Sequence, residues 1–121
     1  MFINNIKICK TVCDGLEKKK IKHLVYISSD AVYADVRGKI SEQSITSPGS
    51  LHGLMHLTRE SILRDKFEKI LCILRPTLIY GIGDAHNGYG PNRFINLALK
   101  NKLISIFGNG EEKRDHIFIK D

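Results

Sequence analysis

Two short, nearly continuous apolar segments constrain the fold most strongly. Residues 23–28 read His-Leu-Val-Tyr-Ile-Ser, and residues 69–74 read Lys-Ile-Leu-Cys-Ile-Leu. Apolar runs of this length are typical of strands in a parallel sheet that is covered on both faces. Arg75 and Pro76 follow the second run, and proline ends it because proline cannot donate to a sheet ladder. Each segment is therefore predicted to be a buried strand.

A helix is predicted before each of these strands. In residues 2–19, apolar side chains recur at helical spacing, at Ile6, Cys9, Cys13 and Leu16. A second helix is expected over residues 51–65, with one stripe of Leu51, Met55, Thr58 and Ile62 and a neighbouring stripe of His52, His56 and Glu60. The order helix, strand, loop, helix, strand indicates an α/β fold. Right-handed crossovers would make the two strands parallel neighbours.

Loops follow both predicted strands. Residues 30–50 are polar and rich in glycine, serine and proline, and a loop of that length in a small domain is usually functional. Ser29 and Thr77 lie in the segments that follow the two strands. Open α/β sheets bind ligands at the carboxyl ends of their strands, so a site is expected there.

The last third of the chain combines glycine-rich loops with short regular elements. A glycine-rich loop over residues 81–90 precedes Pro91, a good first residue for a helix that should end near Asn101. Residues 103–107 and 116–119 are strand candidates on either side of the turn from Gly108 to Gly110.

Composition narrows the class of protein. The chain has 121 residues, of which 42% are hydrophobic, enough for one domain with a modest core. No apolar stretch is long enough to span a bilayer and no signal peptide is evident, so the cytoplasm is the expected compartment and no membrane partner is expected. The net charge of +6 suits an anionic partner such as a phosphorylated small molecule. Nucleic acid is not expected, because zinc-finger spacing and an aromatic RNA-binding strand are both missing from the sequence.

The three cysteines, Cys9, Cys13 and Cys72, lie in apolar stretches and are odd in number. This pattern favours reduced thiols in the core over a disulfide framework. Cys9 and Cys13 share a helix face, a spacing that could also bind a metal, but no second cluster completes a site.

Three sequence blocks resemble a known family. Residues 26–33 read Tyr-Ile-Ser-Ser-Asp-Ala-Val-Tyr, residues 74–81 read Leu-Arg-Pro-Thr-Leu-Ile-Tyr-Gly, and residues 107–116 read Phe-Gly-Asn-Gly-Glu-Glu-Lys-Arg-Asp-His. In this order and spacing they resemble the extended short-chain dehydrogenase/reductases of the NAD-dependent epimerase/dehydratase family. The resemblance implies a Rossmann-like, doubly wound parallel sheet. It also implies an NAD-binding region over residues 1–81 and the start of a substrate-binding region over residues 82–121.

The same resemblance implies reversible hydride transfer at a carbon of a nucleotide-sugar, with NAD or NADP as cofactor. Ser29 occupies the family position that hydrogen-bonds the reacting hydroxyl, although a loop serine that caps backbone groups is the alternative. The register of the family's catalytic Tyr-x-x-x-Lys reads His52-Gly-Leu-Met-His56 here.

Histidine changes the chemistry of that register. Tyrosine needs the lysine, because its ordinary pKa of about 10 is too high for a base at neutral pH, whereas imidazole titrates near 6.5. His52 could therefore act as the base without a cationic helper, and His56 could hydrogen-bond the ribose as a neutral donor. A helix that keeps the family packing but has lost catalysis is the equally weighted alternative.

Further binding residues follow from the resemblance. The expected cofactor contacts, with His56, are Ser28, Arg75, Pro76 and Thr77, although a purely structural role of Arg75 and Pro76 is the alternative. The expected substrate contacts are Asp30 and Arg114. Asn92 and Arg93 join them because a helix is expected to start there, where exposed backbone N–H groups suit phosphate, with surface solvation as the alternative. Arg114 matches a family arginine that contacts the substrate diphosphate, and a guanidinium suits phosphate through its paired donors. No metal is expected: His52, His56 and Glu60 could grip zinc, but a zinc-protease helix would carry glutamate at the position of Gly53.

The glycine-rich turn that holds the cofactor pyrophosphate in complete family members, Gly-x-x-Gly-x-x-Gly, is absent from this sequence. The sequence is thus expected to be a central to C-terminal fragment of such an enzyme. The alternative is a catalytically inactive or truncated relative that serves as a binding or interaction module. A homodimer is possible.

We predict that the 121-residue chain alone binds the cofactor poorly, because the sequence lacks this pyrophosphate turn. Titration of the purified chain with NADH, followed by calorimetry or fluorescence, should show no saturation at micromolar cofactor. Micromolar binding would contradict the prediction.

Overall fold

The computed structural model describes residues 1–35, 38–84, 90–106, 108–111 and 113–121, and its contacts divide the chain into two compact units. The first unit, Met1–Arg75, contains helix α1 (Phe2–Glu17), strand β1 (Leu24–Ile27), the short 3-10 helix η1 (Asp30–Val32), helix α2 (Leu51–Phe67) and strand β2 (Leu71–Leu74). The second unit, Pro76–Asp121, contains strand β3 (Leu78–Tyr80), helix α3 (Gly90–Leu99) and strand β4 (His116–Phe118). The expected boundary at residue 81 is one between a cofactor-binding and a substrate-binding region. That division of binding roles stays a prediction.

The α/β prediction and the parallel pairing of the first two strands are confirmed. Strands β1 and β2 pair in parallel, with Leu24 opposite Leu71 and Ile27 opposite Leu74. Helix α2 connects them, as a parallel pair requires a crossover between its strands.

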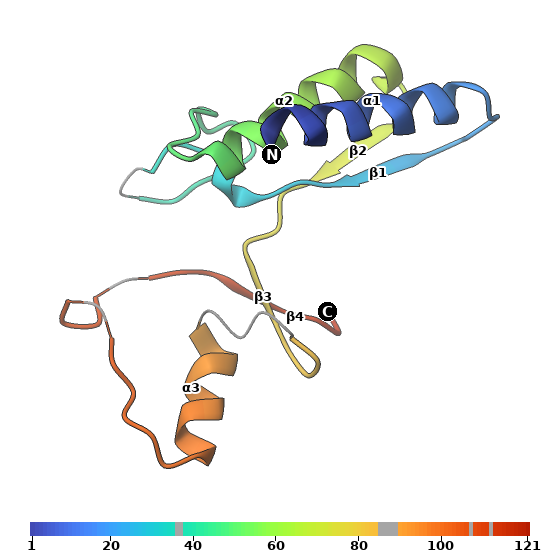
Figure 1. Ribbon diagram of the computed structural model, residues 1–121. Helices are drawn as coiled ribbons and strands as arrows, with labels where there is room; N and C mark the ends of the chain where they lie inside the picture. The colour runs from blue at the N-terminus through green and yellow to red at the C-terminus, as the bar shows by residue number, and fades with distance from the viewer. Residues whose placement is uncertain (36–37, 85–89, 107, 112) are drawn as a thin grey trace. The chain divides into compact units, whose positions relative to one another are not determined.

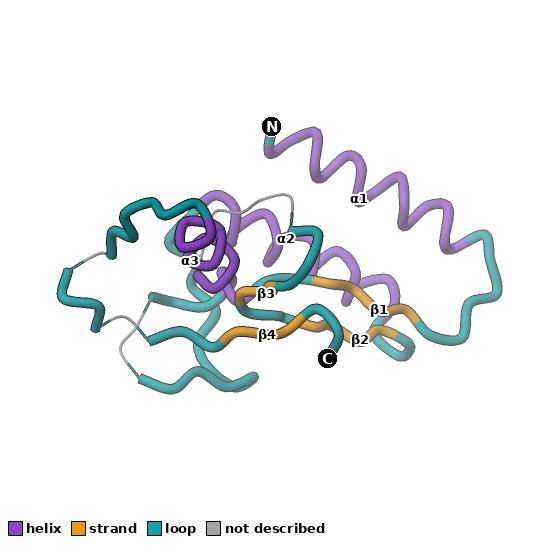
Figure 2. Tube along the Cα trace, turned by 90° about the horizontal axis from the view of Figure 1, so that it is seen from below, coloured by secondary structure: helices purple, strands orange, loops and turns teal. Residues whose placement is uncertain are grey.

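The core of the first unit lies between the helices and one face of this sheet. Figures 1 and 2 show α1 and α2 on the same side of β1 and β2. Cys13, Leu63 and Phe67 form the buried cluster, and the partly buried side chains around it include Cys9, Leu24, Tyr26 and Leu71. The prediction that Cys9 and Cys13 pack as core thiols is therefore confirmed.

The opposite face of the sheet is exposed, so the expectation that both faces are covered is wrong for this structure. Val25 and Ile27 each keep 55% of their surface exposed, Leu74 keeps 48%, and Cys72 is also exposed. Along each strand, partly buried and exposed positions alternate, because successive side chains point toward the helices and away from them. Cys72 is thus not a core thiol.

The second unit departs most from the sequence-based expectations. Residues 78–80 form β3, a strand that the sequence did not predict because Pro76 ends the preceding apolar run. β3 pairs in parallel with β4, while residues 103–106 form no strand; residue 107 lies outside the described residues. The first strand candidate is therefore wrong over its described residues, whereas the second, residues 116–119, is confirmed as β4. The partner of β4 is an earlier strand, reached through α3, rather than its neighbour in sequence.

Smaller differences concern element ends and loops. Helix α1 ends at Glu17, α2 continues to Phe67, and α3 begins at Gly90. The loop predicted over residues 30–50 begins with η1, and its residues 36–37 lie outside the described residues, as do residues 85–89 of the glycine-rich loop. No helix in the part of the chain that the structure describes is long and apolar enough to cross a membrane.

The start of α2 is fixed against the turn that follows β1. The hydroxyl of Ser50 caps the helix by accepting from the backbone N–H of Gly53, at 3.1 Å. A Cβ atom on Gly53 would lie 1.9 Å from the carbonyl oxygen of Ala31 and 2.8 Å from the Cβ of Pro48. Only glycine allows this approach, which brings the first turn of α2 against η1.

We predict that Gly53→Ala destabilises the first unit by at least about 1–3 kcal/mol, because the methyl group forces the backbone of Ala31 away. Gly15 on α1 offers a matched control, since a Cβ there meets nothing within 4 Å. Gly15→Ala should stabilise by about 0.5–1 kcal/mol through helix propensity. Urea unfolding measures both, and equal effects of the two substitutions would contradict the packing seen at Gly53.

Candidate active site

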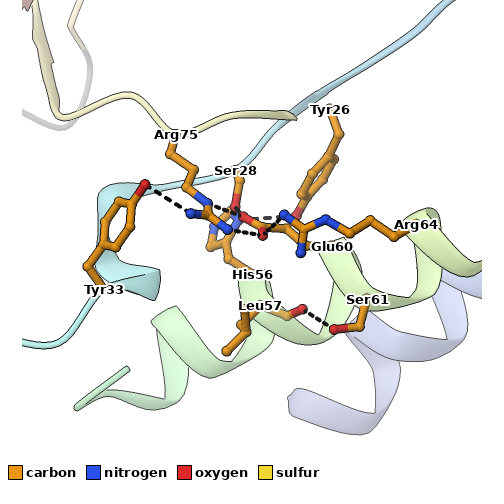
Figure 3. Close-up of polar contacts among 9 residues, drawn as sticks. All are labelled: Tyr26, Ser28, Tyr33, His56, Leu57, Glu60, Ser61, Arg64 and Arg75. Atoms are coloured by element: carbon orange, nitrogen blue, oxygen red, sulfur yellow. Dashed lines mark hydrogen bonds and ion pairs between the residues drawn. The ribbon is translucent and has the colours of Figure 1, made fainter. Parts of the chain in front are cut away.

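A buried carboxylate organises the carboxyl ends of β1 and β2. Glu60, on α2, has no exposed surface. Its Oε1 accepts from the Ser28 hydroxyl at 2.6 Å and from Arg75 Nε at 2.9 Å, and its Oε2 accepts from Arg75 Nη2 at 2.7 Å (Figure 3). Arg64, one turn along the helix, adds an ion pair at 3.2 Å. The carboxylate therefore joins α2 to the residues that follow each strand.

The electrostatics of this group favour the ionised pair. Burial alone would raise the pKa of Glu60, but hydrogen bonds from Arg75 and Ser28, with the charges of Arg75 and Arg64, hold it below its usual value. The hydrogen bond to Glu60 is also the largest cause of the raised pKa of Arg75. Paired donors in one plane make this bidentate geometry strong.

Arg75 extends the network to the turn after β1. Its Nη1 donates to the Tyr33 hydroxyl at 2.9 Å, and the guanidinium carbon lies 4.9 Å from the centre of the Tyr33 ring. One side chain thus fixes the end of β2 against both α2 and the residue after η1.

The two histidines of the predicted catalytic register lie next to each other on α2. Their ring centres are 4.7 Å apart in an edge-to-face arrangement; His52 is exposed and His56 is partly buried. The Tyr26 hydroxyl lies 3.1 Å from His56 Nδ1 (Figure 3). Burial, followed by the nearby His52 and Arg59, lowers the pKa of His56 and so favours the neutral form of this ring.

Ser29 caps backbone groups, which is the alternative to the catalytic role that the resemblance implies. Its hydroxyl oxygen accepts from the backbone N–H of Ala31 at 3.1 Å, at the start of η1, and the hydroxyl donates to Asp30 at 3.2 Å. A hydroxyl oxygen has two lone pairs, so one acceptor position remains. The catalytic role of Ser29 and the substrate contact of Asp30 stay predictions.

The other predicted binding residues divide between the two units. In the first unit, the side chains of Ser28 and Arg75 are used by Glu60. In the second unit, Thr77 donates to the carbonyl oxygen of Asp115 at 2.8 Å, and the Asn92 amide donates to Gly81 and Asp84, both at 2.9 Å. Pro76 is partly exposed, and Arg93 and Arg114 are exposed. Ligand contacts by these residues remain predictions.

The zinc alternative finds no support at the His pair. Three side chains already engage the Glu60 carboxylate, so it offers no free oxygen beside His56. Among the described residues, no group of three His, Cys, Asp or Glu side chains could hold a metal ion.

The sequence indicated Glu60 only as part of a helix stripe and as a possible zinc ligand. It did not indicate Arg64 as a partner of Glu60 or Tyr33 as a partner of Arg75. A usable signal was present. Glu60 lies two turns after His52 on the stripe that faces the sheet, and Arg75 ends a buried strand. A carboxylate and a guanidinium that both face the interior of a small α/β unit are expected to pair.

We predict that Glu60→Gln lowers the free energy of unfolding by about 3–5 kcal/mol, the cost of leaving one member of a buried ion pair without its partner. Glu17→Gln is the control: Glu17 pairs with Lys66 at 2.7 Å, but its side chain is 46% exposed, so the loss should stay under about 1 kcal/mol. Urea unfolding at pH 7 tests both. A Glu60→Gln effect no larger than that of the control would rule out the network as a stabilising centre.

Comparison with known proteins identifies the family to which this chain is similar. The chain matches the NAD dependent epimerase/dehydratase family over residues 1–121. It is 30% identical to the uncharacterized UDP-glucose epimerase YtcB of Bacillus subtilis (strain 168), across 98% of this chain and 38% of that protein. It is 26% identical to dTDP-D-glucose 4,6-dehydratase of Dictyostelium discoideum, across 98% of this chain and 30% of that protein. The chain thus spans well under half the length of these relatives.

Solved structures give the same result. UDP-glucuronic acid 4-epimerase from Bacillus cereus, in complex with UDP-glucuronic acid and NAD, matches with a TM-score of 0.82 and 26% identity, over 96% of this chain and 38% of that one. UDP-N-acetylglucosamine 4-epimerase from Methanobrevibacter ruminantium M1, in complex with UDP-N-acetylmuramic acid, matches with a TM-score of 0.85 and 26% identity. The match covers 97% of this chain and 40% of that one.

The Rossmann-like prediction is confirmed by these matches, and since the family match extends over every residue, the chain belongs to the NAD-dependent epimerase/dehydratase family.

Proposed function

We propose that this chain carries the active-site segment of an NAD-dependent nucleotide-sugar epimerase or dehydratase, with Ser29 and His52 nearest the reacting sugar carbon. The observation that carries the proposal is the approach of Gly53 to Ala31. Ser29 and His52 lie two residues and one residue from this contact. The contact therefore keeps Ser29, the predicted hydroxyl donor, and His52, the predicted base, near the same end of β1.

His52 is the proposed general base. Its side chain is exposed on the first turn of α2, so a substrate hydroxyl has access to the ring. A neutral imidazole takes up a proton near pH 7, which tyrosine does only with a cationic neighbour. The Ser29 hydroxyl, anchored by η1, would turn from Asp30 and donate to the oxygen of the same substrate hydroxyl, whose single proton is then left for His52.

The nicotinamide half of NAD fits the donor set of the first unit. When bound, NAD accepts a hydride from the substrate and returns it. A ribose hydroxyl oxygen needs a donor, and neutral His56 supplies one ring N–H in place of the ammonium of the family lysine. Ser28 and Arg75 would support this site through Glu60, because their side chains are already used there. The structural neighbour from Bacillus cereus binds NAD, in keeping with this assignment.

The second unit would recognise the charged part of the substrate. Arg93 lies on α3 and Arg114 precedes β4, and both are exposed cations. A guanidinium matches the geometry of a diphosphate oxygen pair. Asn92 anchors the loop of Gly81 and Asp84 through its amide, so we assign it a supporting role beside Arg93.

A second candidate function is a binding or interaction module without catalysis. The replacement of both residues of the Tyr-x-x-x-Lys register, by His52 and His56, favours it. The exposed apolar side chains of Val25, Ile27 and Leu74 are also available for contact with another protein.

Turnover in the complete protein that contains this chain separates the two functions. With NAD and a panel of UDP- and dTDP-sugars, NMR of the sugar products should show a C4 epimer or a dehydrated product. His52→Ala should lower kcat by about 10²–10⁴-fold, the usual contribution of a general base. His23→Ala is the matched control, because His23 is exposed at the opposite end of β1 and its loss should leave kcat unchanged.

The outcomes are distinct. Full activity of His52→Ala would refute the role of His52. An inactive native protein that gains turnover as the double variant His52→Tyr, His56→Lys would establish the binding module instead.

A further inference from the structure

Tyr26 contacts the predicted active site from the strand side. Its ring lies on β1 and is partly buried within the core of the first unit, and its hydroxyl lies 3.1 Å from His56 Nδ1 on α2. The ring centres of Tyr26 and His56 are 6.2 Å apart. No sequence motif pointed to this pair, because 30 residues separate its members.

Arg59 lies near this pair. Its guanidinium donates to the side-chain oxygen of Asn5 on α1, and its positive charge acts on the Tyr26 phenol. A nearby cation makes the phenol oxygen a poorer acceptor and the phenol O–H a better donor. The acceptor within reach of that O–H is His56 Nδ1, at 3.1 Å.

The two neutral tautomers of His56 are therefore not equivalent. With hydrogen on Nδ1, the ring would donate to the phenol oxygen, and the phenol proton would lose its acceptor at His56. With hydrogen on Nε2, Nδ1 accepts from the Tyr26 hydroxyl, so Nδ1 and the phenol proton satisfy each other. An unsatisfied buried donor costs about 1–3 kcal/mol, so the second arrangement prevails.

We propose that Tyr26 is a positioning residue that holds His56 in the Nε2–H tautomer and so presents a single neutral donor to an acceptor oxygen of the ligand. This inference rests on the proposed function, in which that acceptor is a ribose hydroxyl of the cofactor. The ring nitrogen opposite Nδ1 then takes the place of a charged ammonium. Neither Tyr26 nor Arg59 touches the ligand in this arrangement; both act through His56.

The groups around the His56 ring are consistent with a neutral state. Tyr26 approaches from β1, and His52, Arg59 and Glu60 lie on α2. The cationic Arg59 and the neighbouring His52 disfavour a second positive charge at His56, and burial acts in the same direction, while Glu60 opposes them.

Imidazole 15N NMR of the full chain tests the tautomer directly. At pH 7.5, long-range proton–nitrogen correlations of His56, assigned by their loss in His56→Asn, should show the Nε2–H pattern alone. Tyr26→Phe should lose this single state and show averaging between both tautomers, with a shift of the Nδ1 signal. Tyr33→Phe, which removes a hydroxyl of the same unit that does not touch His56, should leave the pattern unchanged.

A native His56 that carries its hydrogen on Nδ1, or that populates both tautomers, would overturn the inference. Because this result needs only the native chain, it stands even if Tyr26→Phe fails to fold. An unchanged spectrum in folded Tyr26→Phe would also overturn it. If the tautomer is as proposed while the complete protein shows no turnover, the proposed function fails and the role of Tyr26 stands.

Discussion

The first unit depends on the ion pair between Glu60 and Arg75. Parallel strands place their carboxyl ends at one edge of a sheet, and that edge carries no regular structure of its own. In this chain the carboxylate of one helix bonds Ser28 after β1 and Arg75 after β2, and Arg75 in turn bonds Tyr33 after η1. Four segments are thereby fixed around one buried charge that is matched by hydrogen bonds on both oxygens.

The site chemistry follows from this arrangement. Ser29 is the neighbour of Ser28, and His56 lies one turn before Glu60, so the side chains that we propose to face a ligand are adjacent to the side chains of the network. A second contact, from the Tyr26 hydroxyl to His56 Nδ1, holds the ring that we propose takes the place of the family lysine, and the charge of Arg59 lies nearby. In the proposed site, two histidines replace the tyrosine and lysine of the register, while Ser28 and Arg75 support α2 through Glu60.

Sequence patterns predicted the elements that are defined by local periodicity. The two apolar runs became β1 and β2, and the helical spacing from Ile6 to Leu16 became α1, because burial of an apolar face decides both. The parallel pairing of β3 with β4 was missed, because a three-residue strand has no distinct pattern and its partner lies 38 residues away. The exposed outer face of β1 and β2 was also missed, because apolar residues there do not reveal which face has a neighbour.

The candidate site was predicted only in part for the same physical reason. Family motifs indicated Ser29, His52 and His56, and α2 does bring the two histidines together. The supporting residues Tyr26, Tyr33 and Glu60 were not assigned their roles, because each acts through a contact between distant segments. Long-range hydrogen bonds depend on the three-dimensional approach of strands and helix, which spacing along one element does not encode.

The central claim is that Glu60 and Arg75 stabilise the unit as a coupled pair. A double-mutant cycle with Glu60→Leu, Arg75→Met and the combined variant, measured by urea unfolding, tests it most directly. Each single change should strongly lower the free energy of unfolding. The loss in the combined variant should be smaller than the sum of the two single losses by about 2–3 kcal/mol. Additive effects, within about 0.5 kcal/mol, would contradict it.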